Sequence, residues 1–331
     1  MAGDERHQQL EAWIIEVLGQ PLACEAASSD ASFRRYFRYQ FLDRSVIAMD
    51  APPASEDCKP FVAIDRMLAE AGVCVPDLIA EDIDNGFLLL SDLGADTYLD
   101  VMSRPNFDPD TADSLFHDAI TALIRMQRID NIDSLPSYDE ALLFKELTLF
   151  TDWYLVKHLG LALDVQWQDL LQKLFEQIIA LTLKQAKVFV HRDYMPRNLM
   201  VSTPNPGVLD FQDAVSGPIS YDPICLFKDA FISWPEEKVQ QWLQQYWREA
   251  KNTGLPVPED VDSFLLDCDI MGVHRHLKVI GIFARICHRD GKPKYLQDAP
   301  RFFDYLNKVA ARRPELDLLK QVLIRLEQVT A

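Results

Sequence analysis

The sequence predicts an α+β protein in which a small sheet-rich lobe precedes a larger helical lobe. Aromatic residues recur in period-two order between residues 33 and 41, which is the pattern of a strand. From residue 110 onward, apolar residues instead recur every three or four positions, which is the pattern of a helix. A chain of 331 residues is also too long for one ordinary hydrophobic core. The pattern changes at the stretch LSDLG, so we expect lobes over residues 1–93 and 94–331.

The first lobe is predicted to alternate between helices and strands. A helix over residues 4–18 is followed by strands over 32–41 and 45–50. The turn-rich stretch APPASEDCKP separates these strands from a helix over 61–72, which ends at a glycine. The apolar run GFLLL then predicts a further strand that leads into the polar turn SDLG.

The second lobe is predicted to be helical with a short strand insert. Amphipathic helices are expected over 110–129, 139–160, 164–186, 236–251, 259–289 and 297–327, the last of them broken near Pro314. Strand patterns interrupt this series only at KVFVHRD, NLMVS and GVLDF.

Composition excludes several classes of protein. The net charge of −18 argues against a nucleic-acid partner, because a phosphate backbone is bound by a basic surface. The six cysteines are widely spaced and form no C-x-x-C pair, so a zinc site has little support. No apolar run is long enough to span a bilayer, and the charged N-terminus does not resemble a signal peptide. We therefore expect a cytoplasmic protein with no membrane contact and no obligate protein partner.

The tripeptide His-Arg-Asp occurs twice, and only the first copy has surroundings that predict chemistry. Asp193 is followed five residues later by Asn198, then by a predicted hairpin and by Asp210. This spacing is that of phosphotransferases, in which one carboxylate orients the acceptor hydroxyl and takes its proton. An amide oxygen and a second carboxylate hold magnesium against the phosphates. We expect the hairpin to bring Asn198 and Asp210 together, opposite Asp193.

The second copy has none of these features. Tyr295 stands where an asparagine would be needed after Asp290, and no strand or Asp-Phe pair follows. The segment RICHRDGKPKYL is instead typical of a helix end with basic residues in its last turn and a Gly-Lys-Pro stop.

The segments HRDYMPRNLM and VLDFQDAVSGPISYDPICLF resemble the aminoglycoside phosphotransferase and choline kinase-like family. The resemblance is specific over residues 188–229 and extends over the whole chain. It is closest to the bacterial N-acetylmuramate/N-acetylglucosamine anomeric kinases of cell-wall recycling, on the further stretches DASFRRYFR and RHLKVIGIFARICHRDGKPKYL. It implies a bilobal protein-kinase-like fold and an ATP- and Mg²⁺-dependent kinase. Such an enzyme would phosphorylate the anomeric 1-hydroxyl of N-acetylmuramate, N-acetylglucosamine or both, giving the sugar 1-phosphate for peptidoglycan recycling.

Carried over position by position, the resemblance assigns roles in the catalytic region. Asp193 would be the catalytic base, and Asn198 and Asp210 the magnesium ligands. Asp222 would brace the catalytic loop by hydrogen bonding, a role compatible with capping a helix before Pro223. Asp213 would be either a helper or a turn residue. The stretch after the last strand of the first lobe would bind adenine through its backbone; its residues are Leu90, Ser91, Asp92 and Leu93.

The chain departs from the protein-kinase pattern at two places. The loop SSDASFRRY contains no glycine, so the serines, Ser32 among them, and a tight turn of amides would have to hold the phosphates. Met49 stands where the strand lysine is expected. Our hypothesis is that an arginine replaces this lysine, because a guanidinium binds phosphate with two parallel hydrogen bonds. The candidates are Arg34, Arg35 and Arg38 of the first hairpin, which would otherwise form a solvated strand face, and Arg197 of the catalytic loop.

The acceptor site is less clearly marked. Two stretches, KELTLFTDWYL and GVHRHLK, contain the carboxylate, aromatic and basic groups that sugar hydroxyls and a lactyl carboxylate would contact. The candidates are Glu146, Asp152, Trp153, Arg275 and His276, each of which could instead be a core or solvated residue. Two other functions remain open at this point. One is a kinase of another small molecule with the same fold, such as an aminoglycoside, choline or homoserine, and the other is a nucleotide-binding pseudokinase.

Overall fold

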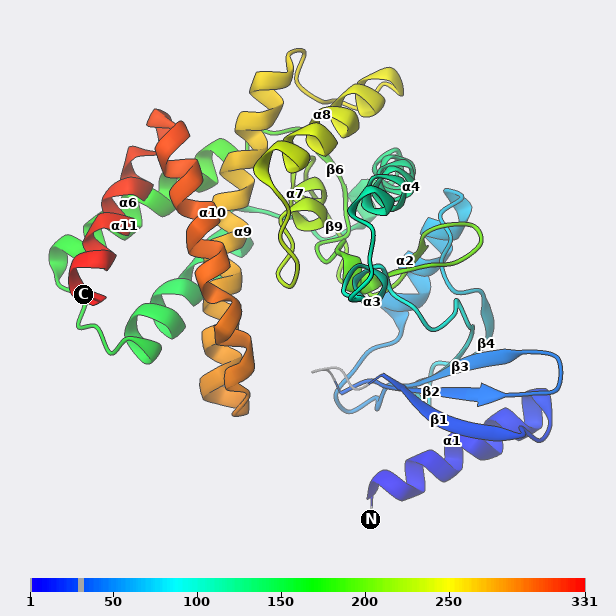
Figure 1. Ribbon diagram of the computed structural model, residues 1–331. Coiled ribbons are helices and arrows are strands. Elements are labelled where there is room, and N and C mark those ends of the chain that lie inside the picture. Colours follow the sequence, from blue (N-terminus) through cyan, green and yellow to red (C-terminus); the bar gives the residue numbers. More distant parts are fainter. Residues whose placement is uncertain (1, 29–32, 331) are drawn as a thin grey trace. The chain divides into compact units, whose positions relative to one another are not determined.

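The computed structural model describes residues 2–28 and 33–330. The chain forms two compact units, which are described separately. The N-terminal unit consists of Met1–Met126 and Arg197–Ala214, and the C-terminal unit of Gln127–Pro196 and Val215–Ala331. The N-terminal unit thus contains more of the chain than the predicted first lobe, and the lobe boundary at residue 93 stays a prediction. One unit is built on an antiparallel sheet and the other is mainly helical, which confirms the α+β class (Figure 1).

The N-terminal unit is built on a five-stranded antiparallel sheet. In spatial order its strands are β1 (Ala23–Ser28), β2 (Arg35–Gln40), β3 (Ser45–Asp50), β5 (Phe87–Ser91) and β4 (Leu78–Asp82). The three predicted strands are β2, β3 and β5. The two edge strands, β1 and β4, were not predicted from the sequence. The sequence of β1, ACEAAS, has no aromatic or β-branched residue, and β4 is a short strand with only alternating partial burial.

The two faces of this sheet differ in what covers them. Helix α1 (Ala2–Leu18) packs Leu10 and Ile14 against one face, in a core with Tyr39 of β2, Val46 of β3 and Leu89 of β5. Side chains alternate between faces along a strand, so the neighbouring positions point to the other side. That second face lines the pocket described below.

Helices and a short hairpin complete the N-terminal unit. They are α2 (Lys59–Glu70), α3 (Tyr98–Met102), α4 (Pro109–Gln127) and the antiparallel strands β7 (Leu199–Met200) and β8 (Gly207–Val208). Helix α3 was not predicted because it has only five residues. A capping box between Thr97 and Asp100 starts this helix, in which each side chain binds the other residue's backbone N–H. A β-bridge joins Thr97 to Met200, which ties α3 to the hairpin.

The C-terminal unit contains one two-stranded sheet and most of the helices. Its strands are β6 (Lys187–Val190) and β9 (Val215–Pro218), which pair antiparallel. Its helices are α5 (Glu140–Leu149), a π-helix (Phe150–His158), α6 (Val165–Thr182), α7 (Tyr221–Phe227), α8 (Glu236–Asn252), α9 (Val261–Asp290), α10 (Ala299–Arg312) and α11 (Asp317–Thr330). The break near Pro314 is confirmed, since a 3₁₀ turn over Pro314–Leu316 separates α10 from α11. Among the described residues, no helix is long and apolar enough to cross a bilayer.

The predicted helix over 139–160 is wrong in one respect, because its second half is a π-helix. The change occurs at Phe150, where α9 crosses at very close range. A β-carbon added to Gly281 of α9 would lie 2.5 Å from the Leu149 carbonyl oxygen and 2.5 Å from the Phe150 nitrogen. Real β-carbons do not approach backbone atoms this closely, so the crossing requires glycine.

Replacing Gly281 by alanine is expected to lower the free energy of unfolding by about 1–3 kcal/mol, the usual cost of overpacking a core. Gly272 of the same helix is the matched control. A β-carbon there would be 3.5 Å from its nearest neighbour, so Gly272→Ala should be neutral or stabilising by up to about 1 kcal/mol through helix propensity. Chemical denaturation of both variants measures the difference. Equal midpoints for the two variants would show that the crossing has room to relax.

Candidate active site

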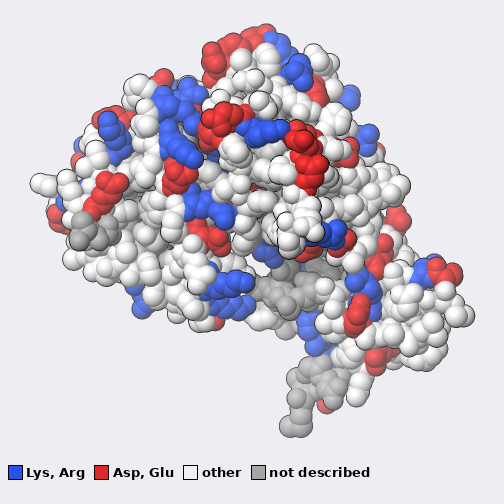
Figure 2. All heavy atoms as spheres, in the orientation of Figure 1, with Lys and Arg blue, Asp and Glu red and all other residues white. Residues whose placement is uncertain are grey.

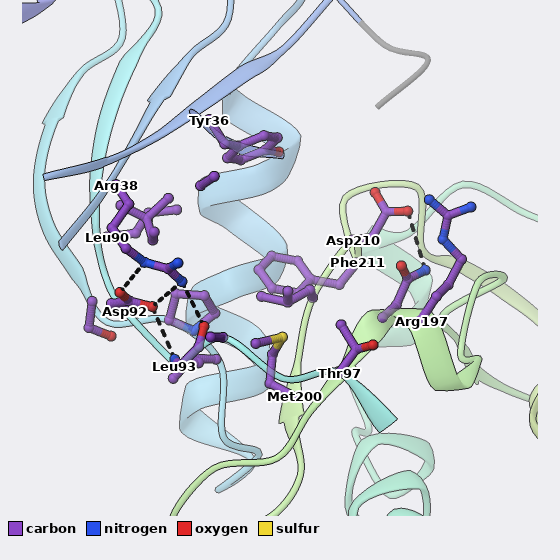
Figure 3. Close-up of a pocket in the computed structure, with 18 of the residues that line it drawn as sticks. Tyr36, Arg38, Leu90, Asp92, Leu93, Thr97, Arg197, Met200, Asp210 and Phe211 are labelled. Atoms are coloured by element: carbon purple, nitrogen blue, oxygen red, sulfur yellow. Dashed lines mark hydrogen bonds and ion pairs between the residues drawn. The ribbon is translucent and has the colours of Figure 1, made fainter. Parts of the chain in front are cut away.

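A pocket of about 330 Å³ lies within the N-terminal unit (Figure 3). Its walls come from the sheet, from the segment after β5, from α2 and from the β7–β8 hairpin. The residues on which the site depends are Tyr36, Arg38, Ile47, Phe61, Leu90, Ser91, Asp92, Leu93, Arg197, Asn198, Met200, Asp210 and Phe211. The apolar side chains of Met200 and Phe211 lie in its middle, and Leu90 lies beside Arg38. Charged groups stand at two ends, with Arg38 and Asp92 at one and Arg197 and Asp210 at the other. An apolar pocket with charged groups at its ends suits a heterocyclic base that carries an anionic tail.

The β7–β8 hairpin brings Asn198 and Asp210 together, as the spacing predicts. The Leu209 amide donates to the Asn198 carbonyl oxygen over 2.9 Å, which closes the hairpin at this end. Asn198 Nδ2 lies 3.4 Å from Asp210 Oδ2, and Gln212 Nε2 donates to Asp210 Oδ1 over 2.8 Å. Asp210 has a φ of +63°, a left-handed conformation that aspartate tolerates better than most residues.

This pair can supply two oxygen ligands to a hard cation. No cluster of three or more His, Cys, Asp or Glu side chains suitable for a metal occurs among the described residues. Two protein ligands suffice for magnesium, which keeps waters and takes phosphate oxygens as its remaining ligands. The residues present therefore fit a metal ion that is held jointly with a nucleotide.

The three candidate arginines of the first hairpin are each paired with a carboxylate of the same unit. Arg34 lies 3.1 Å from Glu56, and Arg35 pairs with Asp50. Arg38 donates to Asp92 over 2.6 Å and to the Gly94 carbonyl oxygen over 2.8 Å. Ser32 lies outside the described residues. The prediction that one of these arginines binds phosphate stays a prediction. To bind phosphate, the arginine would have to contact its carboxylate and the phosphate together, or leave the carboxylate for the phosphate.

The catalytic loop of the C-terminal unit follows β6 and is held by Asp222. This side chain accepts hydrogen bonds from the backbone N–H groups of His191 (2.7 Å) and Arg192 (3.1 Å). Burial raises the pKa of the Asp222 carboxyl to about 7, although both amides lower it. The predicted bracing role of Asp222 is confirmed. It is not a helix cap, however, since α7 begins at Tyr221 after Ser220.

Asp193 itself is half-buried at the end of this loop. Its amide donates to His191 Nδ1 over 3.3 Å, and its carbonyl oxygen accepts from the Met195 amide over 2.9 Å. Both contacts involve the backbone of Asp193. The chain passes into the N-terminal unit between Pro196 and Arg197.

Comparison with known proteins decides the family. The sequence model described as the phosphotransferase enzyme family matches residues 23–261. The chain belongs to this family. As a phosphotransferase it transfers a phosphoryl group to a hydroxyl acceptor.

Curated relatives resemble this phosphotransferase over its whole length. The N-acetylmuramate/N-acetylglucosamine kinase of Pseudomonas aeruginosa is 54% identical over 99% of both chains. The kinase of the same name from Neisseria meningitidis is 42% identical over 97% of this chain and 96% of its own.

Solved structures share the fold at low sequence identity. An ADP-bound aminoglycoside phosphotransferase superposes with a TM-score of 0.61 at 14% identity, covering 91% of this chain and 97% of its own. A choline kinase from Streptococcus pneumoniae gives 0.64 at 12% identity, covering 93% and 99%. These likenesses confirm the predicted fold class.

The predicted acceptor residues of the phosphotransferase have very different exposures. On the π-helix, Asp152 is exposed and Trp153 is half-buried. Arg275 and His276 are buried in α9, where Arg275 Nη1 donates to the Lys228 carbonyl oxygen over 3.1 Å. Glu146 is buried too, and its carboxylate is bound by three side chains of the C-terminal unit. The structure therefore presents only the π-helix pair to solvent, and all five assignments stay predictions.

The second His-Arg-Asp copy is a helix end, as predicted. Helix α9 ends at Asp290, and Gly291 follows with a φ of +67°, the left-handed conformation that often terminates helices. Arg289 and Asp290 pair over 2.6 Å.

Lys278 of α9 is a cation that binds Glu146 and was not predicted as a site residue. The available indication was its position in GVHRHLK, where His, Arg and Lys stand between the apolar stretches of the helix.

Asp65 of α2 is a buried carboxylate whose Oδ1 has no hydrogen-bond partner among the described residues. Burial, with a smaller contribution from Asp77, raises the pKa of this carboxyl to about 6, although Arg66 lowers it. The folded pKa lies above the unfolded value of about 3.9, so the folded state loses stability as the pH rises from about 4 to 6. Above about pH 6 Asp65 is ionised in the folded state, and the protein carries the full cost in stability of this buried charge.

Replacing Asp65 by asparagine is expected to stabilise the protein by about 1–2 kcal/mol at pH 8, with the gain shrinking as the pH is lowered toward 5. Thermal unfolding at several pH values measures this. Glu70→Gln, an exposed change in the same helix, should show no such pH dependence. A less stable Asp65→Asn protein at pH 8 would contradict the sign.

Proposed function

We propose that this phosphotransferase uses ATP to phosphorylate the anomeric 1-hydroxyl of N-acetylmuramate, N-acetylglucosamine or both. The product would be the sugar 1-phosphate, an intermediate for peptidoglycan recycling. The observation that carries the proposal is the 54% identity over 99% of both chains to an N-acetylmuramate/N-acetylglucosamine kinase. The need for ATP supports a cytoplasmic location. Acidic and basic side chains are interspersed on the surface shown in Figure 2, in keeping with a small-molecule substrate rather than a nucleic acid.

The pocket of the N-terminal unit supports a role in nucleotide binding. Its apolar middle would take the adenine ring, and the backbone of Leu90 to Leu93 would contact the edge of the base. Asn198 and Asp210 would hold Mg²⁺, which when bound neutralises charge on the phosphate oxygens. Arg197 lines the same pocket and would shield charge beside them.

In the proposed reaction, Asp193 accepts the proton of the anomeric hydroxyl. The anomeric oxygen forms a bond to the γ-phosphorus as the bond to the β-phosphate oxygen breaks, and ADP leaves with that electron pair. Because the transfer needs little covalent help, the protein contributes mainly by orienting the hydroxyl and by stabilising charge. Asp152 and Trp153 are the most accessible candidates for contacting the sugar.

A coupled ADP-release assay tests the function. Purified protein is given N-acetylmuramate, N-acetylglucosamine, kanamycin, choline or homoserine, each with and without Mg²⁺. We expect magnesium-dependent turnover of the amino sugars alone. Equal turnover of a 1-O-methyl glycoside would contradict the anomeric assignment, and turnover of kanamycin, choline or homoserine would favour another kinase of this fold. ATP binding without any turnover would favour a pseudokinase, the alternative raised by Met49 and the glycine-free loop.

A further inference from the structure

Glu146 is the centre of a buried ion-pair network in the C-terminal unit. Only 5% of the residue is exposed. Its carboxylate accepts hydrogen bonds from the Tyr138 hydroxyl and from Arg192 Nη2 (2.5 Å), and Lys278 Nζ lies 2.8 Å away. A carboxylate with three donors has little remaining capacity for a substrate hydroxyl. The network therefore points to a different role from the predicted sugar contact.

The charge on Glu146 is stabilised by its surroundings. Burial by itself raises the pKa of this carboxyl, but Lys278, His274 and Arg192 outweigh it and lower the pKa to about 2. Lys278 also donates to the Tyr221 hydroxyl over 3.0 Å, so both cations are fixed on more than one side. Glu146 is thus ionised at every pH at which the protein is expected to work.

One partner of Glu146 belongs to the catalytic loop and has an unfavourable backbone. Arg192 directly precedes Asp193 and has a φ of +76°, a conformation that side chains with a β-carbon rarely adopt. Such residues persist where surrounding contacts hold them, and they concentrate at functional sites. The amide of Arg192 donates to Asp222, and its carbonyl oxygen accepts from the Cys225 thiol over 3.5 Å.

Asp222 and Glu146 thus hold Arg192 at two different points. Asp222 binds its backbone, whereas Glu146 binds its guanidinium, which also lies 5.9 Å from the centre of the Tyr138 ring. A backbone contact alone would be compatible with any side chain at position 192. The buried ion pair with Glu146 restrains the Arg192 side chain itself. Arg192 directly precedes Asp193, the proposed base.

We propose that Glu146 is a positioning residue that acts through Arg192 to fix the direction of the Asp193 carboxylate. This inference rests on the proposed function, in which Asp193 is the base. Glu146 does not touch the substrate. Its ion pair holds the left-handed turn at Arg192, and the turn sets where the next side chain points.

A double-mutant cycle tests the coupling. Glu146→Gln keeps the size of the side chain and removes the charge, so we expect kcat to fall by about 10–100-fold with the KM for ATP changed less than threefold. Arg192→Gly removes the guanidinium and supplies a residue that adopts positive φ without strain. In that background Glu146→Gln should lower kcat by less than threefold further. Glu140→Gln, an exposed change in the same helix, is the matched control and should leave kcat unchanged.

The cycle separates positioning from mere stability. Removing a buried charge partner also destabilises a fold, so melting temperatures and circular dichroism are recorded for all four proteins. If kcat losses multiply in the double variant, or if they follow the melting temperatures, the positioning role is overturned. The assignment of the base is tested apart from this, by Asp193→Asn. Retained activity there would overturn the assignment of Asp193 as the base, whereas lost activity with multiplicative losses in the cycle would overturn only the role of Glu146.

Discussion

Replacing Asp193 by asparagine is expected to lower kcat by about 10²–10⁴-fold, the usual contribution of a positioned general base. Asparagine has nearly the same shape but cannot take the proton of the acceptor hydroxyl. The two backbone contacts given above for Asp193 remain available to asparagine. The KM for ATP and the melting temperature should change little. Steady-state kinetics with the preferred sugar, together with thermal unfolding, measure these quantities.

The second His-Arg-Asp copy provides the control for this experiment. Asp290→Asn makes the same chemical change in the same tripeptide, but at a helix end where the carboxylate is hydrogen-bonded by the neighbouring Arg289. Its kcat should equal that of the unmodified protein. A comparable loss of activity in both variants would mean that neither loss reports on a catalytic base.

Replacing Asp210 by asparagine is expected to lower kcat by about 10²–10³-fold and to raise the Mg²⁺ concentration needed for half-maximal activity. A bound metal contributes several kcal/mol of charge stabilisation in the transition state, and each 1.4 kcal/mol corresponds to a factor of ten. Asparagine tolerates the left-handed conformation found at this position, so the backbone should not move. The measurement is kcat as a function of Mg²⁺ concentration at saturating ATP and sugar.

Asp84→Asn is the matched control for the metal-site variant, because Asp84 is an exposed carboxylate of the same unit. It should leave both kcat and the Mg²⁺ requirement unchanged. If Asp210→Asn gave an unaltered magnesium curve, Asp210 would not be a metal ligand.

Sequence reasoning succeeded where the relevant residues are close along the chain. Asn198 and Asp210 flank a hairpin of two short strands, so their spacing alone predicts that they meet. Asp222 was recognised through the resemblance, and its contact with the catalytic loop is confirmed. In both cases a local or family pattern contained the necessary information.

Sequence reasoning failed where contacts join distant segments. Glu146 meets Arg192 and Lys278 only because three separate elements pack together, and no periodicity in α5 reveals that its carboxylate is buried. The same holds for the π-helix, whose position is associated with the crossing at Gly281 rather than with a distinctive residue pattern. The edge strand β1 was missed because its small residues carry no strand preference, so the neighbouring strand β2 determines its conformation.

The ion pairs of the first hairpin have a consequence for how an anion would approach the pocket. Arg34, Arg35 and Arg38 stand opposite Glu56, Asp50 and Asp92, so their charges largely cancel within a few ångströms. Cancelled charges produce little field beyond the distance at which salt screens them. An anionic ligand would therefore not be drawn in from afar by this hairpin. Recognition would begin only at contact, when a guanidinium can turn from its carboxylate to the ligand.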